Sequence, residues 1–148
     1  MKLVLPFEDE IPDRFSKYFD DDSPRVEFED VPEGAETVAL IMDDPDAPVS
    51  GAFTHWVIWN IPKGEAVPEN IPREKRLENG ARQGETDYGD IGYGGPRPPS
   101  GTHGYRFKAY AVDTELDLAA GASKQQLLDA LEGHVIEEDE VTADYTKP

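Results

Sequence analysis

Two histidines stand next to the segments of this sequence that could carry chemistry. His55 lies inside an otherwise apolar run, and His103 directly precedes a second such run. The carboxylates of Asp44 and Asp46 follow a third apolar run at a spacing of two residues. Imidazole and carboxylate groups held together can act as a general acid–base pair, ligate a divalent metal ion or bind an anion. The remaining histidine, His134, follows a helix-stop signal, and we expect it at the surface.

Two stiff loops flank these groups. Residues 44–48 read DPDAP, and residues 94–101 read GGPRPPSG. Proline fixes φ and reduces the conformational freedom of a loop, and rigid loops that leave buried strands commonly hold functional sites. The alternative for each loop is a turn stiffened by proline without a functional role. Taken alone, each of these two histidines is more often a structural residue whose N–H has a partner than a ligand-binding group.

Binding is better supported than catalysis. The chain has no cysteine, which excludes disulfides, thiolate nucleophiles and cysteine-ligated metals. It has no GxSxG, HExxH or P-loop motif, and Ser50 and Ser100 lie in loops without a supporting motif. We therefore expect no enzymatic activity, no catalytic residue, no metal and no cofactor. A metal-assisted hydrolase that uses the aspartates and histidines as ligands is the weaker alternative.

Length and charge narrow the class of protein. The chain has 148 residues and a formal net charge of −18, so we expect a single domain over residues 1–148. Such a charge argues against nucleic acids and anionic membrane surfaces as partners. No apolar run is long enough to span a membrane, and the start lacks a signal-peptide pattern, which favours a cytoplasmic protein without stable membrane insertion.

The abundance of acidic residues is typical of cytoplasmic proteins of halophilic archaea. Salt screens the repulsion between like charges, so we expect stability to fall as salt is removed. The densest acidic runs, residues 20–22 and 137–140, are interpreted as solvated surface.

The pattern of apolar residues predicts a mostly β protein with one helix. Alternating or continuous apolar runs predict strands, a Ser123–Gln126 capping box followed by Gly133 predicts a helix, and the segment rich in proline and glycine predicts a long loop. The predicted strands are 26–29, 37–42, 53–61 and 104–112, with a short closing strand near 135–141, and the loop is 62–101. The two-residue period places His55 on the face of Val57 and Trp59, and His103 on the face of Tyr105.

Three motifs carry a resemblance to a known family. They are DPDAP at 44–48, HWVIWNIP at 55–62 and GYGGPRPPSGTHGY at 92–105. Together they resemble the phosphatidylethanolamine-binding protein family, above all its bacterial and archaeal branch of Raf-kinase-inhibitor-like proteins. The likeness runs from about Ser23 to Tyr145, in matching order and spacing.

This resemblance implies a β-sandwich of two antiparallel sheets with one or two short helices. It also implies one small pocket that takes phosphate-like anions or phospholipid head groups. Transferred position by position, the ligand-binding residues would be Asp44, Asp46, Pro48, His55, Pro98, His103 and Tyr105, with Gly95 beside them.

Two positions depart from the family pattern. Arg97 stands where members of this branch commonly have cysteine, and Gly104 stands where they have arginine. Gly104 should point away from the His103 face. Arg97 can either reach the pocket or lie in solvent, and we favour solvent.

The function we expect is non-catalytic binding of a small phosphorylated or otherwise anionic ligand. The two imidazoles and the Tyr105 hydroxyl would donate to the anion, a protonated ligand oxygen would donate to Asp44, and Asp46 would orient one imidazole. The alternative is a protein–protein interaction module, like the kinase or protease inhibitors among the eukaryotic relatives. An exposed apolar patch beside the pocket would favour it. The resemblance is also compatible with a homodimer, which nothing in the residues specifies.

Overall fold

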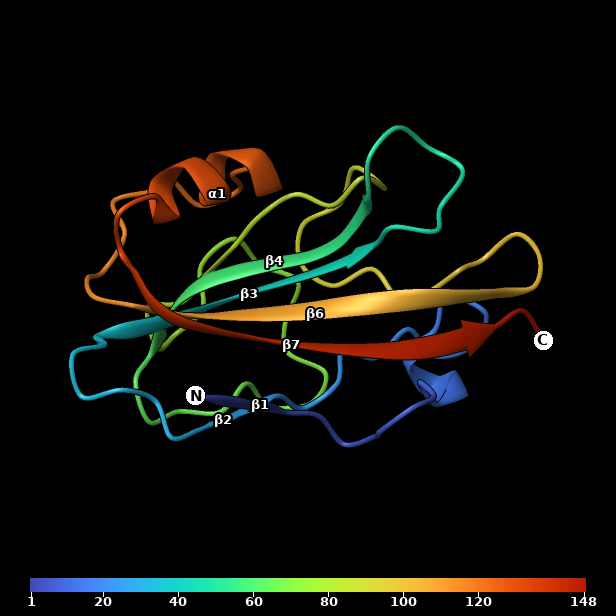
Figure 1. The fold of residues 1–148 in the computed structure, drawn as a ribbon. Helices are drawn as coiled ribbons and strands as arrows, with labels where there is room; N and C mark the ends of the chain where they lie inside the picture. Colours follow the sequence, from blue (N-terminus) through green and yellow to red (C-terminus); the bar gives the residue numbers. More distant parts are fainter.

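The protein is built around one five-stranded antiparallel sheet, and the computed structural model describes all residues from Met1 to Pro148. Its strand order is β5-β4-β3-β6-β7, and the pair β1-β2 forms a second antiparallel sheet (Figure 1). The strands are β1 (Lys2–Val4), β2 (Glu27–Glu29), β3 (Thr37–Asp44), β4 (Phe53–Pro62), β5 (Arg82–Gln83), β6 (Thr102–Val112) and β7 (Val135–Thr146). A 3₁₀ turn, η1 (Asp13–Phe15), and one helix, α1 (Lys124–Leu131), complete the fold. The predicted fold class, mostly β with two antiparallel sheets and a short helix, is confirmed.

The central strand β3 explains why the apolar run from Thr37 to Met42 is continuous rather than alternating. All eight of its residues are buried, because β1-β2 covers one face of the large sheet and α1 covers the other (Figure 1). Leu40 and its neighbours at a spacing of two pack into the larger core on the β1-β2 side. Ile41 packs into the smaller core beneath α1. A strand buried on both faces shows no polar side.

Helix α1 begins as its sequence predicts. The Ser123 side chain accepts from the Gln126 N–H, and the Gln126 side chain accepts from the Ser123 N–H, which satisfies two free donors at the helix start. The chain leaves the helix through Gly133, whose φ of +84° favours glycine. The helix buries Leu127 and Leu131 against the sheet.

An ion-pair cluster ties α1 to the sheet. The buried Asp43 carboxylate accepts two hydrogen bonds from Arg106, at 2.9 and 3.1 Å, and one from Lys124 at 3.3 Å. Burial by itself would raise the pKa of Asp43. The Arg106 hydrogen bonds and the Lys124 charge outweigh it and hold that pKa below its ordinary value.

The prediction of only a short closing strand is wrong. β7 has twelve residues and pairs with β6 along nearly its whole length, from Thr102↔Thr146 to Val112↔Val135. Eight of its twelve side chains are exposed, and the acidic run 137–140 has no apolar alternation; Val141, Ala143 and Tyr145 alternate only in its second half, where they pack on the larger core. Backbone pairing with β6 makes it a strand. The sequence also gave no signal for β1 or η1.

Candidate functional site

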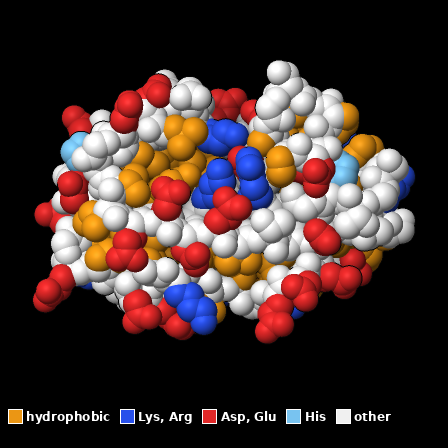
Figure 2. All heavy atoms as spheres, in the orientation of Figure 1, with side chains coloured by type: hydrophobic (Ala, Val, Ile, Leu, Met, Phe, Trp, Pro, Cys, Tyr) orange, Lys and Arg blue, Asp and Glu red, His pale blue; other side chains and the backbone are white.

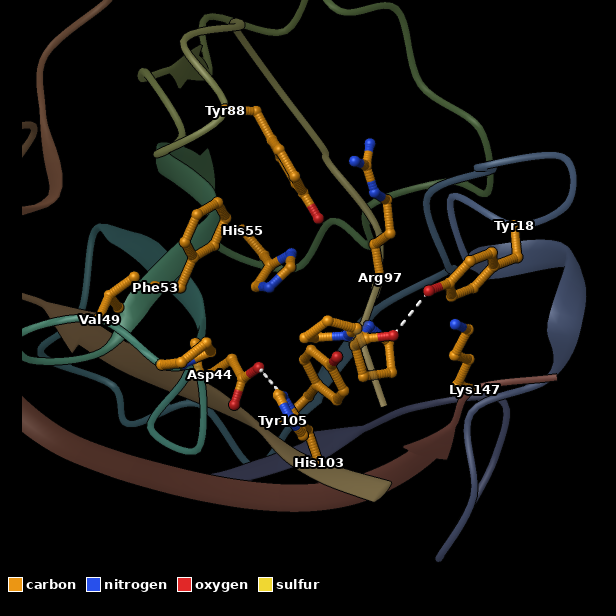
Figure 3. A pocket seen from close by; sticks show the side chains of 14 residues that line it. Tyr18, Asp44, Val49, Phe53, His55, Tyr88, Arg97, His103, Tyr105 and Lys147 are labelled. Carbon is orange, nitrogen blue, oxygen red and sulfur yellow. Dashed lines mark hydrogen bonds and ion pairs between the residues drawn. The ribbon is translucent and has the colours of Figure 1, made fainter. Parts of the chain in front are cut away.

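A cavity of about 610 Å³ opens where β3, β4 and β6 meet the loops at one end of the sheet (Figure 3). Six of the eight residues expected to bind a ligand line it: Asp44, Pro48, His55, Pro98, His103 and Tyr105. The other two, Asp46 and Gly95, do not line it. The structure thus brings together both stiff loops and two of the three histidines.

A β-bulge in β4 aims His55 into this cavity. Met42 pairs with Trp56 and Asp43 pairs with Thr54, so His55 is an extra residue in β4. An extra residue reverses the alternation of the strand and redirects the side chain. The expectation that His55 shares a face with Val57 and Trp59 is therefore wrong: those two pack under α1, whereas the His55 ring lies 5.2 Å from the Tyr105 ring.

Hydrogen bonding fixes the tautomer of His55. Its Nδ1 lies 2.7 Å from the carbonyl oxygen of Gly94, and because a carbonyl only accepts, Nδ1 carries the proton. Burial lowers the pKa of His55, against the opposing influence of the Gly94 carbonyl and the Asp44 charge. The imidazole is thus neutral at neutral pH, and its other nitrogen, Nε2, is an acceptor. Trp59 Nε1 is the only buried side-chain nitrogen or oxygen without a partner, so Nε2 opens onto the cavity.

Asp44 orients the second imidazole. Its Oδ2 lies 2.6 Å from Nδ1 of His103, and its Oδ1 accepts from the Asp46 N–H at 2.8 Å (Figure 3). Both carboxylate oxygens therefore already have donors, which reduces the repulsion that an incoming anion would meet. The expected role of Asp46 is corrected: its Oδ2 accepts from the Gly104 N–H at 2.8 Å and ties the DPDAP loop to the start of β6. Gly104 faces away from His103, beside Asp46.

Contacts with Asp21 and Tyr88 hold the proline-rich loop behind the cavity. The Gly95 N–H donates to Asp21 Oδ1 at 2.8 Å, and Asp21 is held in turn by Lys17, 3.0 Å from Oδ2, and by Arg73. A Cβ on Gly95 would lie 2.2 Å from a backbone oxygen, so only glycine fits. The Gly95 carbonyl accepts from the Tyr88 hydroxyl at 2.9 Å. Gly95 is a positioning residue, which is why it lies beside the cavity without lining it.

Several lining residues escaped prediction. Tyr88 comes from the long loop, Tyr18 from the N-terminal segment and Lys147 from the C-terminus, and Phe53 begins β4. The Tyr18 hydroxyl donates to Pro98 O at 2.6 Å. None of these residues stands in a motif. The only local sequence signal for any of them is at Tyr88, an aromatic residue next to the turn glycine Gly89.

The cavity contains two tyrosine hydroxyls that remain protonated. Burial raises the pKa of Tyr105 well above its ordinary value, and the nearby Asp44 charge adds to the effect. Burial likewise raises the pKa of Tyr88, with the Arg97 charge acting in the opposite direction. Both hydroxyls therefore keep their protons at physiological pH. The Tyr88 proton is donated to the Gly95 carbonyl, which leaves the Tyr105 hydroxyl free to donate to a ligand.

Positive charge gathers at the mouth of the cavity. Arg97 is exposed, as expected, yet it also lines the cavity, so the expectation that it lies in solvent alone is corrected (Figure 3). Lys147 lines the same opening, and Asp44 is the only acidic residue in the lining. Elsewhere the chain is strongly acidic, with a net charge of −18, and on the face seen in Figure 2 acidic side chains are scattered around a central group of Lys and Arg. The cavity thus differs in charge from the molecule around it.

No group of three or more histidine, cysteine or acidic side chains is arranged to hold a metal ion. No helix has the length and apolar character needed to cross a membrane.

Known proteins match both the sequence and the fold. Residues 5–146 match the family described as phosphatidylethanolamine-binding protein. UPF0098 proteins of Methanothermobacter thermautotrophicus and Pyrococcus abyssi are 48% and 43% identical; each match covers 93% of this chain, and 91% and 79% of those proteins.

Two solved structures have the same fold over 99% of this chain. A putative phosphatidylethanolamine-binding protein homolog from Chlamydia trachomatis has a TM-score of 0.88 at 34% identity, with 97% of that chain covered. E. coli YbcL, described as a new member of the mammalian PEBP family, has a TM-score of 0.89 at 27% identity, with 98% covered. With its three motifs, its two-sheet fold and these relatives, the chain belongs to the phosphatidylethanolamine-binding protein family.

Proposed function

We propose that the cavity binds a small phosphorylated or otherwise anionic ligand without catalysing a reaction on it. One observation carries the proposal: the lining supplies two imidazoles, the free Tyr105 hydroxyl and two cations, and its single carboxylate is already engaged by His103 and the Asp46 amide. Stiff proline loops reduce the ordering cost of binding. Two solved relatives carry the family name, which supports the same class of ligand.

The two imidazoles would play different parts. Nδ1 of His103 is committed to Asp44, so its Nε2 donates to an anion when the ring is protonated. Nε2 of His55 is an acceptor, so it suits a ligand oxygen that carries a proton. A phosphate monoester has its second pKa near about 6 and can supply such an oxygen. The proposed bound species is therefore a monoanion that donates to His55 and accepts from His103 and Tyr105.

Isothermal titration with inorganic phosphate tests the proposal, at about 2 M KCl to screen the overall negative charge. We expect saturable binding that His103→Ala abolishes. His134→Ala is the matched control, because His134 is exposed and pairs with Asp113, away from the cavity. Absence of binding to folded wild-type protein, or equal loss in both variants, would contradict the proposal.

A second candidate is an interaction module of the inhibitor type. Tyr18, Phe19 and Val49 are exposed by 37%, 53% and 49%, and two of them, Tyr18 and Val49, line the cavity mouth. An exposed apolar rim beside a pocket suits a protein partner. This candidate predicts inhibition of a kinase or a protease in a panel of purified enzymes, relieved by Phe19→Ser together with Val49→Ser. No inhibition by wild type would remove it.

A further inference from the structure

The cations at the cavity mouth have no protein partner. Of the 14 basic side chains, seven form ion pairs with carboxylates: Arg14, Lys17, Arg25, Arg73, Arg106, Lys108 and Lys124. Arg97 and Lys147 belong to the other seven, and they are the only two of those seven that line the cavity, in a chain where acidic residues outnumber basic ones 32 to 14. In so acidic a chain, two unpaired cations that line one cavity suggest that their counter-charge comes from a ligand.

These cations belong to a part of the cavity separate from the histidine pair. Figure 3 shows Arg97 beside Tyr88 and Lys147 beside Tyr18, both on the side opposite Asp44 in this view. The influence of the Arg97 charge on Tyr88 agrees with this placement. The two side chains come from different elements, the proline-rich loop and the segment after β7, and the Lys147 N–H is anchored to the Gly101 carbonyl at 2.9 Å.

The cavity is also too large for phosphate alone. Its volume of about 610 Å³ falls within the range of roughly 300–1,000 Å³ that suits drug-sized ligands. An anion held by His55, His103 and Tyr105 would leave the mouth unfilled and both cations without a counter-charge. A ligand that extends from the histidines to the mouth would meet positive charge there.

We propose that Arg97 and Lys147 bind a second negative charge on the ligand. The cavity would then select phosphate monoesters that carry a carboxylate or another anion over those with a neutral or cationic tail. This inference rests on the proposed function, because it assumes that the first anion lies at the histidines. It also gives a role to Arg97, one of the two departures from the family pattern.

Three phosphate monoesters of similar length test the inference by titration calorimetry. Phosphoglycolate has an anionic tail, ethyl phosphate a neutral one and phosphoethanolamine a cationic one. We expect affinity to fall in that order, with about fivefold between the first two, since a partly exposed charge pair contributes modestly. Arg97→Gln and Lys147→Gln should each weaken the binding of phosphoglycolate by a larger factor than that of ethyl phosphate, and so reduce the preference between the two. Arg76→Gln and Lys2→Gln are matched controls, because both residues are exposed and neither lines this cavity.

The outcomes separate this inference from the proposed function. If phosphoglycolate and ethyl phosphate bind equally, and His103→Ala abolishes both, the inference is wrong and the proposed function stands. If the preference survives in both cavity variants, the second charge binds elsewhere and the inference is again wrong. If none of the three esters binds to folded protein, both proposals fail.

Discussion

Replacement of Asp21 should show how strongly the wall of the cavity depends on one carboxylate. Asp21 lies in the acidic run 20–22, which the sequence alone presents as solvated surface. In the structure it accepts the Gly95 N–H at 2.8 Å, and it contacts Lys17 and Arg73. Its backbone φ is +56°, in the left-handed region that glycine and asparagine tolerate best.

These contacts give an order of effects on the free energy of unfolding. Asp21→Gly keeps the backbone relaxed but leaves the buried Gly95 N–H without a partner, which costs about 2 kcal/mol. Asp21→Ala adds about 1 kcal/mol for a left-handed alanine, for about 3 kcal/mol in total. Asp21→Asn keeps an acceptor and the φ preference, so it loses only partly exposed ion pairs, worth about 0.5 kcal/mol. Asp20→Ala, at an exposed neighbour, should change stability by less than about 0.5 kcal/mol.

Urea denaturation of these four variants at about 2 M KCl measures the order directly. Titration with phosphate should also show weaker binding for Asp21→Gly, because the loop from Gly95 carries Pro98 into the cavity lining. If Asp21→Gly and Asp20→Ala unfold at the same urea concentration and bind phosphate equally, Asp21 does not hold the loop and the reasoning is refuted.

Three further predictions concern pH, salt and the ion-pair cluster. Burial lowers the pKa of His55, so below about pH 6.5 the unfolded chain takes up a proton that the folded protein does not, and the free energy of unfolding falls by up to about 1.4 kcal/mol per pH unit. Thermal unfolding of wild type and His55→Gln between about pH 7.5 and 5.5 should show a smaller pH dependence in the variant. An equal pH dependence in both proteins would contradict this prediction. The protein has a net charge of −18, and at about 2 M KCl a Debye length of about 3 Å or less screens the repulsion between its acidic residues. The melting temperature should therefore fall as KCl is removed, and an unchanged melting temperature in salt-free buffer would exclude a salt requirement. Asp43→Asn should lower the free energy of unfolding, measured by urea titration, by about 3 kcal/mol, because it leaves Arg106 and Lys124 without their shared carboxylate. Asp117→Asn, at an exposed position, serves as the control.

The elements predictable from sequence were those whose own residues specify them. The apolar run of β3 and the capping box of α1 carry their structure locally, through burial and through hydrogen bonds made within a few residues. β7 does so only in part: Val141, Ala143 and Tyr145 alternate, but the acidic residues 137–140 before them have no apolar period, and pairing with β6 holds that half extended. Its full length was therefore not visible from the sequence.

The same distinction applies to the cavity. The histidines and the proline loops stand in motifs, so their meeting could be expected from the resemblance. The orientation of His55 depends on a bulge created by how β4 pairs with β3, which a strict two-residue period cannot reveal. Tyr18 and Lys147 come from opposite ends of the chain, and only tertiary packing brings them to the same opening.

The imidazole nitrogens report most directly on whether the cavity binds an anion. The chain has three histidines; two line the cavity, and His134 lies at the surface beside Asp113. Their ¹⁵N signals can be followed by NMR as phosphate is added in high KCl. Binding at the proposed site predicts saturable shifts of the Nε2 signals of His55 and His103, with His134 unchanged. Signals of all three that stay constant, or that drift together without saturation, would contradict a phosphate-binding cavity.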